Sequence, residues 1–170
     1  MRRTPIEKKY ACTIDLPKDK RPGYYAQLIK ALATFAPPQD RDKELLIYDY
    51  NHQRLTALAL MDEYHIRTEC FELYLLPTNS QISTSFTDYG FTSMNTRFYV
   101  YVHLVSMFSF ATATNRMQQE QAYLQMQEYI IAQWTHETQQ HYIVDTQFTE
   151  LMMRIARAYE CDICIPDHTP

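Results

Sequence analysis

Glycine, the residue that most readily adopts turns with positive φ, is almost missing from this chain: Gly23 and Gly90 are the two among 170 residues. Average usage of about 7% would supply roughly twelve. Glycine also lets a backbone approach a phosphate closely, so the common nucleotide-binding loops depend on it. Two isolated glycines cannot form G-x-x-x-x-G-K-[ST], G-x-G-x-x-G or the G-x-S-x-G nucleophile elbow. The sequence therefore excludes these loop-built sites.

The length and composition are typical of a globular protein. Hydrophobic residues make up 46% of the chain and charged residues 21%, which is enough apolar surface for a packed core. We expect a single α+β domain over residues 1–170, without an internal repeat or a linker. Within it we expect a basic N-terminal arm at residues 1–8 and a C-terminal tail at residues 161–170.

Charge is distributed unevenly along the chain. Residues 1–21 contain seven basic and three acidic side chains, whereas residues 22–170 contain nine basic and seventeen acidic ones. The basic start is typical of a solvated edge strand protected by lysines, and an arm for nucleic acid or an acidic partner is the alternative. The net charge of −4 disfavours general nucleic-acid binding.

Nothing in the sequence predicts export or membrane insertion. Arg2 and Arg3 are followed by Thr4–Lys9 without an apolar stretch, and no apolar run approaches the length of a membrane span. Four cysteines in a chain of this length do not make a disulfide scaffold. We therefore expect a cytoplasmic protein with reduced thiols and no membrane partner.

Hydrophobic periodicity predicts alternating strand and helix in the first part of the chain. Residues 9–16 alternate as a strand, residues 24–35 carry apolar side chains at helical spacing, and residues 45–50 and 66–76 have strand composition. Residues 51–64 fit two interpretations, a hairpin returning through an alternating strand or a helix. We favour the hairpin, because the helical apolar stripe is interrupted at Asp62.

The second part of the chain is expected to hold a central strand and two helices. Residues 78–96 are rich in Ser, Thr and Asn and include a short strand at 82–88, and residues 97–108 are apolar on both alternating faces. Residues 114–141 lack Gly and Pro and predict a long helix, and an apolar stripe over 145–159 predicts a last one. The pattern indicates an α+β fold: a mostly antiparallel sheet with one helix after the first strand and two C-terminal helices packed on it.

Two groups of cysteine and histidine residues contain the side chains that commonly bind metals. Cys161, Cys164 and His168 are candidate zinc ligands or a redox pair, although a structural zinc site would need a fourth ligand such as His141 or Cys70. We favour two small apolar side chains that anchor the tail, and predict no other cofactor. In the predicted helix, His136 and His141 are five positions apart and point in directions about 140° apart, so they would not share a metal.

No arrangement of residues in the sequence singles out a catalytic centre. Asp62, Glu63 and His65 are sequence neighbours, which on a helix or a strand face different directions. His103 lies in the predicted central strand, where a histidine buried in the core is the favoured interpretation. An enzyme would need a site assembled from scattered residues such as His65, His103, Asp62 and Glu69.

Tyrosine is abundant, with fourteen residues, half of which fall between positions 48 and 101. Tyrosine is ordinary strand filler, but it is also enriched at protein interfaces, and aromatic side chains stack on nucleic-acid bases. Acidic residues outnumber Arg54 and Arg67 between positions 44 and 88, which disfavours the nucleic-acid interpretation. The tyrosines that we expect to form a protein-binding surface are Tyr48, Tyr50, Tyr74, Tyr89, Tyr99 and Tyr101.

We therefore expect a non-enzymatic protein-binding module, such as an inhibitor, an immunity-type protein or an accessory protein of a phage or mobile element, acting on a larger partner. The alternatives are an enzyme with the scattered site described above, and a metal-stabilised or nucleic-acid-associated module that uses the C-terminal cysteines and the basic start. The oligomeric state is not predicted.

Overall fold

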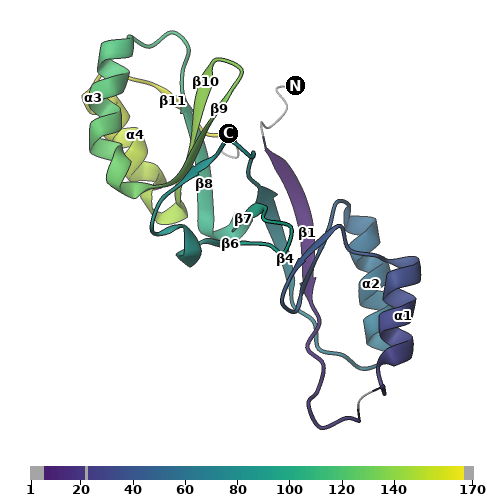
Figure 1. Ribbon diagram of the computed structural model, residues 1–170. Coiled ribbons are helices and arrows are strands. Elements are labelled where there is room, and N and C mark those ends of the chain that lie inside the picture. The colour runs from purple at the N-terminus through teal and green to yellow at the C-terminus, as the bar shows by residue number, and fades with distance from the viewer. Residues whose placement is uncertain (1–5, 22, 167–170) are drawn as a thin grey trace. The chain divides into compact units, whose positions relative to one another are not determined.

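The computed structural model describes residues 6–21 and 23–166 of the chain. Their contacts divide the chain into two compact units (Figure 1). The N-terminal unit comprises residues 7–75 and 92–99, and the C-terminal unit comprises residues 1–6, 76–91 and 100–170. The prediction of a single domain stays a prediction, because two compact units can belong to one domain.

The N-terminal unit is built on an antiparallel sheet with two helices on one face. Its elements are, in order, β1 (Glu7–Thr13), α1 (Ala26–Phe35), β2 (Asp40–Asp42), β3 (Leu45–Tyr48), α2 (Asn51–Glu63) and β4 (Cys70–Leu75). The strands lie in the order β2-β3-β1-β4, and the sheet continues beyond β4 as β7 (Phe98–Tyr101) and β6 (Gly90–Thr92). Leu28 and Leu32 of α1 and Ala57 and Met61 of α2 pack against Cys12 and the neighbouring strand residues to form the core.

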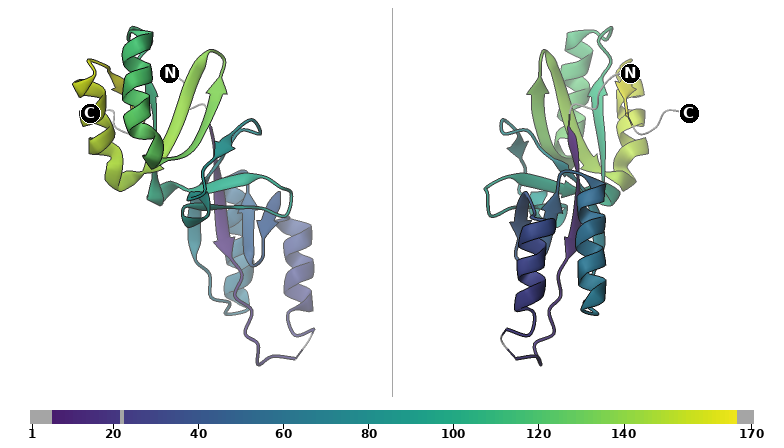
Figure 2. Two further views of the ribbon diagram at one scale, coloured as in Figure 1. Left: turned by 60° about the vertical axis from the view of Figure 1, so that its left-hand side comes forward. Right: turned by 90° about the vertical axis from the view of Figure 1, so that its right-hand side faces the viewer.

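The C-terminal unit also packs two helices on one face of an antiparallel sheet (Figures 1 and 2). Its elements are β8 (Val105–Phe110), α3 (Arg116–Met126), β9 (Ile130–His136), β10 (Gln139–Asp145), α4 (Thr149–Ala158) and β11 (Ile163–Cys164). The strand order is β9-β10-β8-β11, with the short β5 (Gln81–Ile82) added outside β9. Phe108, Phe110 and Tyr142 of the sheet form its core with Ala122, Met126, Met152 and Ala156 of the helices.

The two units have the same topology, which is a repeat that the sequence did not reveal. Each runs strand, helix, strand, strand, helix, strand, and in each the strands are ordered second, third, first, fourth. This is the βαββαβ arrangement known as the ferredoxin-like or split βαβ motif. The prediction of no internal repeat was therefore wrong for the structure, while the α+β class with mostly antiparallel sheets is confirmed.

The ends of the second helices show how closely the two units correspond. The amide of His65 donates to the carbonyl of Asp62, and that of Ile66 to Met61; likewise Glu160 donates to Arg157 and Cys161 to Ala156. This pair of hydrogen bonds defines the Schellman motif, which usually places a glycine at the residue with positive φ. His65 and Glu160 occupy that position here, with φ of 55° and 56°.

Three predicted elements need correction. Residues 51–63 form helix α2 and not a hairpin. Its buried residues Ala57 and Met61 are one turn apart, so a narrow apolar stripe is sufficient to pack the helix on the sheet. Residues 114–141 are not one helix: α3 ends at Met126 and a β-hairpin, β9–β10, begins at Ile130. The predicted strand over 97–108 is broken by a 3₁₀ helix at Val102–Leu104.

The two terminal segments are only partly described. Of the predicted basic arm at residues 1–8, Ile6 is buried and residues 7 and 8 belong to β1, while residues 1–5 lie outside the described residues. In the predicted tail at 161–170, Cys161 is buried and β11 pairs with β8, so this part of the tail is integrated into the sheet.

Candidate functional site

The C-terminal unit contains a polar cleft of about 840 Å³ at one end of its helix-covered face. The loop after β8, the start of α3 and the tip of the β9–β10 hairpin surround it. Its lining is almost entirely uncharged: Phe110, Ala111, Thr112, Thr114, Arg116, Gln119, Glu120, Tyr123, Gln133, Thr138, Gln139, Gln140 and Tyr142. We call this feature the polar cleft.

Local hydrogen bonds hold the walls of the polar cleft in place. Asn115 caps α3 by accepting a hydrogen bond from the amide of Met117 (2.9 Å), which sets where the helix starts. Gln119 donates from its side chain back to the carbonyl of Thr114 (3.3 Å). On the opposite wall Gln139 donates to Ser109 Oγ (3.1 Å) and to the carbonyl of Phe110 (3.0 Å), joining β10 to β8.

Amide and phenol groups form a second network along the floor of the polar cleft. The Tyr123 hydroxyl donates to Gln133 Oε1 (3.3 Å), and Gln133 Nε2 donates to Gln81 Oε1 (3.1 Å). Burial, with a smaller effect of Tyr123, raises the pKa of Tyr142 to about 12, so this phenol stays neutral at physiological pH. An ion pair at the rim joins Arg116 Nε to Glu120 Oε1 (3.3 Å), and both of its side chains are exposed. The polar cleft therefore offers neutral donors and acceptors beside the three aromatic rings of Phe110, Tyr123 and Tyr142.

A second cleft, of about 300 Å³, occupies the corresponding place in the N-terminal unit. It lies between the end of β1, helix α1 and the β2–β3 hairpin, but it is lined mainly by the aliphatic side chains Ile14, Leu16, Ile29, Leu32, Ala33 and Leu46. Arg41, Lys43 and Glu44 stand at its rim. The two units thus have a cleft at the same place in their topology, but the side chains that line the two clefts differ in polarity.

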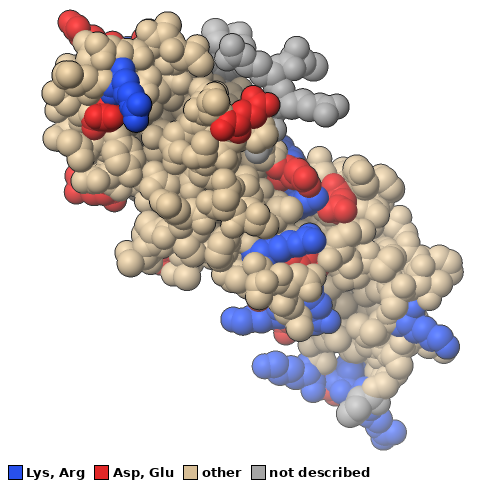
Figure 3. Space-filling model, turned by 45° about the horizontal axis from the view of Figure 1, so that its top comes forward, with Lys and Arg blue, Asp and Glu red and all other residues tan. Residues whose placement is uncertain are grey.

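Charge also differs between the two units. The N-terminal unit contains eleven basic and eleven acidic residues, whereas the described part of the C-terminal unit contains three basic and eight acidic ones. On the face shown in Figure 3, the blue side chains accordingly gather over the N-terminal unit. The polar cleft therefore belongs to the acidic part of the protein.

The predicted tyrosine surface is only partly exposed. Tyr48, Tyr74 and Tyr99 are buried in the N-terminal unit, so the expectation that they form a binding surface is wrong for these three. The Tyr48 hydroxyl donates to the carbonyl of Ala36 (3.0 Å), and burial raises its pKa well above the usual value. The alternation of residues along a strand does not show which face of a sheet is covered by other elements. In the structure, the side chains of all three tyrosines are covered.

The remaining predicted tyrosines lie at or near the surface. Tyr50 is 62% exposed and its ring stacks on His52 at 5.6 Å between centroids. Tyr89 is half-buried and donates to Asp145 Oδ2 (2.8 Å), which raises the pKa of the phenol. Tyr101 is half-buried beside Phe91, with ring centroids 5.8 Å apart. A role for these three in binding stays a prediction.

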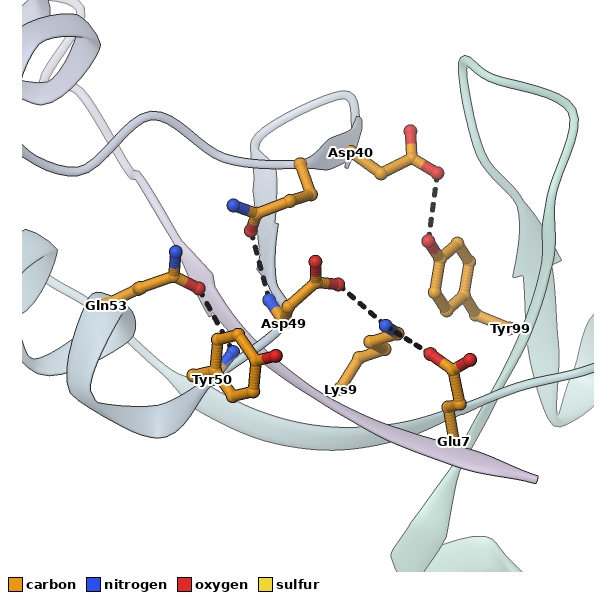
Figure 4. A network of polar contacts seen from close by, with 8 residues as sticks. Glu7, Lys9, Asp40, Asp49, Tyr50, Gln53 and Tyr99 are labelled. Atoms are coloured by element: carbon orange, nitrogen blue, oxygen red, sulfur yellow. Dashed lines mark hydrogen bonds and ion pairs between the residues drawn. The ribbon is translucent and has the colours of Figure 1, made fainter. Parts of the chain in front are cut away.

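The N-terminal unit contains a polar network that the sequence did not indicate (Figure 4). Asp40, which is 3% exposed, accepts hydrogen bonds from Ser93 Oγ (2.5 Å), the Tyr99 hydroxyl (3.0 Å) and the amide of Arg41 (2.8 Å). These bonds connect β2 to the 92–99 segment. The two side-chain donors, Ser93 and Tyr99, lie more than 50 residues from Asp40 in the sequence, so no local spacing predicts the network.

Lys9 is the second buried charge in this network. Its ammonium lies 2.6 Å from both Asp49 Oδ1 and Glu7 Oε2, and the residue is 7% exposed. Burial lowers the pKa of Lys9, but the hydrogen bonds and charges of Asp49 and Glu7 outweigh it and raise the pKa overall. The lysine is therefore a structural cation that joins β1 to the end of β3.

The candidate metal ligands are not gathered in the described structure. Cys161 is buried, Cys164 is exposed on β11, and His168 lies outside the described residues. Within residues 6–21 and 23–166, no three His, Cys, Asp or Glu side chains are grouped as a metal site would require. The zinc interpretation of the first two cysteines with His168 stays a prediction.

His136 and His141 are closer than expected. They lie on neighbouring strands of the β9–β10 hairpin with ring centroids 6.3 Å apart, so the prediction that they point apart on a helix was wrong. His141 is buried and stacks on Trp134 at 5.5 Å. Burial, followed by the nearby His136, lowers the pKa of His141 and favours its neutral form.

The scattered residues proposed for an enzyme are all exposed. Asp62, His65 and Glu69 are solvated in the N-terminal unit, and the adjacent Glu63 is exposed as well. His103 is exposed within the 3₁₀ helix, so the expectation of a core histidine was wrong. His65 has a structural role that the sequence did not indicate: it adopts a positive φ and ends helix α2.

Among the described residues, no helix has both the length and the apolar character that a membrane crossing requires.

Comparison with known proteins identified no relative: no family model, no curated protein and no solved structure matches this chain.

Proposed function

We propose that this protein is a non-enzymatic binding module whose polar cleft holds an extended segment of a partner polypeptide. The observation that carries the proposal is the lining of that cleft, in which four glutamines and three threonines surround two tyrosine rings. A glutamine amide carries two donor hydrogens and an acceptor oxygen, so the lining can pair with the backbone of a bound segment through the positions that the internal hydrogen bonds leave over. Sites of this kind combine a few placed polar groups with aromatic contact area.

The volume and walls of the cleft support this occupant. A hollow of about 840 Å³ is within the range of sites that enclose a ligand of several residues or a drug-sized molecule. Gln119 and Gln139 are tied to the protein backbone, so the walls are held in position before a partner arrives. A prearranged site loses less conformational entropy on binding.

The charge of the surrounding unit indicates the kind of partner. With eight acidic and three basic residues in its described part, the C-terminal unit would attract a partner that carries Lys and Arg near the bound segment. Inhibition of such a partner, immunity against it, or service as an accessory protein of a phage or mobile element are biological uses that this binding would allow.

The test uses a random peptide library displayed on phage and the purified full-length chain. Thr138→Arg places a long charged side chain at the rim of the polar cleft, and Thr146→Arg makes the same change at an exposed position on the same unit outside the lining. We expect enriched peptides whose affinity falls at least tenfold for the Thr138→Arg variant and less than twofold for the Thr146→Arg variant. Peptides that bind both variants equally, or a library without enrichment, would overturn the proposal.

A further inference from the structure

Two cysteines face each other across strands β1 and β4 of the N-terminal unit. The strand register pairs Cys12 directly with Cys70. The amide of Thr13 donates to the carbonyl of Glu69 at 2.9 Å, so the neighbouring pair is a hydrogen-bonded one. Because the two kinds of pair alternate in an antiparallel ladder, Cys12 and Cys70 form a non-hydrogen-bonded pair, in which side chains approach most closely.

The backbone spacing that is typical of such a pair falls within the range that disulfides span. Cα atoms of a non-hydrogen-bonded pair are about 4.5 Å apart, and disulfides span Cα separations of roughly 4.4–6.8 Å. Arg54 of α2 holds the two strands together beside the pair, since its Nη1 donates to the carbonyls of Phe71 (3.1 Å) and Ala11 (3.4 Å). Both thiols are free in the structure.

The two thiols have very different surroundings. Cys12 is completely buried in the core formed with α1 and α2, whereas Cys70 is exposed. Burial, and then the adjacent Cys70, raises the pKa of the Cys12 thiol to about 12. A reagent in solution therefore meets Cys70 first, and Cys12 is placed to react with the Cys70 sulfur once that sulfur is part of a mixed disulfide.

We propose that Cys12 and Cys70 are a redox pair that closes into a cross-strand disulfide by exchange with a small disulfide such as oxidised glutathione. The Cys70 thiolate attacks one glutathione sulfur, forming a mixed disulfide and releasing one glutathione thiolate. Cys12 then loses its proton and attacks the Cys70 sulfur, which releases the second glutathione. One small disulfide is reduced to two thiols, and two protein thiols are oxidised to one disulfide.

Closure changes the stability of the N-terminal unit. The link encloses the segment that contains α1, β2, β3 and α2, so it restricts much of that unit in the unfolded chain. We expect the midpoint of thermal unfolding to rise by roughly 5–10 °C in the oxidised protein. The pair would thereby make the lifetime of the protein respond to the thiol balance of its surroundings, whatever the polar cleft binds.

The experiment treats the native full-length protein with excess oxidised glutathione, blocks remaining thiols with N-ethylmaleimide, and maps the digest by mass spectrometry. We expect a peptide that links Cys12 to Cys70 and a protein that has lost two hydrogen atoms. Faster closure at higher pH should follow from the raised pKa of Cys12, because the second step requires its thiolate. Subsequent reduction with dithiothreitol should remove the rise in the unfolding midpoint.

Variants separate this pair from the other thiols. Cys70→Ser changes an exposed side chain, so it should fold normally and lose both the linked peptide and the thermal shift. The matched change Cys164→Ser, also at an exposed strand position but opposite Ser109, should retain both. The proposal is overturned if Cys70 of the native protein remains a glutathione adduct while Cys12 stays a free thiol over a day at pH 8.5.

Discussion

Five residues other than glycine adopt positive φ in the described structure: Lys43, His65, Thr96, Glu137 and Glu160. Lys43 and Glu137 turn the β2–β3 and β9–β10 hairpins, and His65 and Glu160 end α2 and α4. A side chain in this conformation costs roughly 1–2 kcal/mol relative to glycine, because its Cβ crowds the carbonyl oxygen. Residues other than glycine thus occupy these strained positions, and four of the five lie at matching places in the two units.

Replacing these residues with glycine should stabilise the protein. We expect Glu137→Gly and Glu160→Gly each to raise the free energy of unfolding by ~0.5–1 kcal/mol, measured by urea denaturation. The control is Glu120→Gly, which places glycine inside helix α3 and should lower the free energy by about 1 kcal/mol. Equal destabilisation by all three substitutions would contradict the prediction.

Removal of the buried Asp40 carboxylate should be strongly destabilising. Asp40→Ala removes the buried carboxylate to which Ser93 and Tyr99 donate, so we expect a loss of ~2–4 kcal/mol in chemical denaturation. Asp42→Ala, two residues along the same strand and only half-buried, should lose less than about 0.5 kcal/mol. Similar losses in the two variants would mean that the network contributes little.

The β9–β10 hairpin is the element that was predicted least well from the sequence. The absence of glycine and proline over residues 114–141 extended the helix prediction from α3 into this hairpin, although β-branched and aromatic residues are common in it. Its turn at Glu137-Thr138 has no glycine or asparagine to mark it. Pairing with β8 and burial of Ile131, Trp134 and Ile143 hold these residues in strands. Helix α2 was misjudged for a related reason, since its apolar residues also alternate and periodicity over a short segment cannot separate the two structures.

Burial of His141 in the β9–β10 hairpin should make the free energy of unfolding depend on pH. Because the pKa of folded His141 is lowered below that of the unfolded chain, the unfolded state takes up a proton first as the pH falls. Stability is therefore complete above about pH 6.5 and declines as the pH drops through that value towards the folded pKa. We expect the urea midpoint to fall less between pH 7.5 and pH 5 in His141→Phe than in the parent.

The control for the acid effect is His52→Phe, at an exposed position of α2. It should keep the parent's pH dependence, because this ring lies at the surface and leaves the burial of His141 unchanged. An unchanged dependence in His141→Phe would show that other groups cause the acid sensitivity.

Each unit of the molecule has its own core. Met61 in the N-terminal unit and Met126 in the C-terminal unit are both fully buried, and each lies on a helix packed against its own sheet. The two cores contain different residues on the same βαββαβ plan, which is why the repeat is visible in topology and not in sequence. Topology depends on which segments pair, and many side-chain sets of suitable volume satisfy one plan.

Matched core substitutions test whether the units open separately. Met61→Ala and Met126→Ala each remove a buried side chain and should lower stability by about 2–5 kcal/mol. We expect hydrogen–deuterium exchange to accelerate mainly in α1, α2 and β1 for the first variant and in α3, α4 and β10 for the second. Uniform acceleration over the whole chain in both variants would show one cooperative unit.

By itself, the sequence determined the α+β class, most strands of the N-terminal unit, helices α1 and α4, and the exclusion of glycine-built nucleotide sites. These features depend on local periodicity and on the conformational freedom of single residues, which a sequence displays directly. Only the tertiary structure decided the repeat, the β9–β10 hairpin, the polar cleft and the pairing of Cys12 with Cys70. Each of these brings together residues far apart in the chain, and long-range packing and strand pairing choose among local conformations of similar energy.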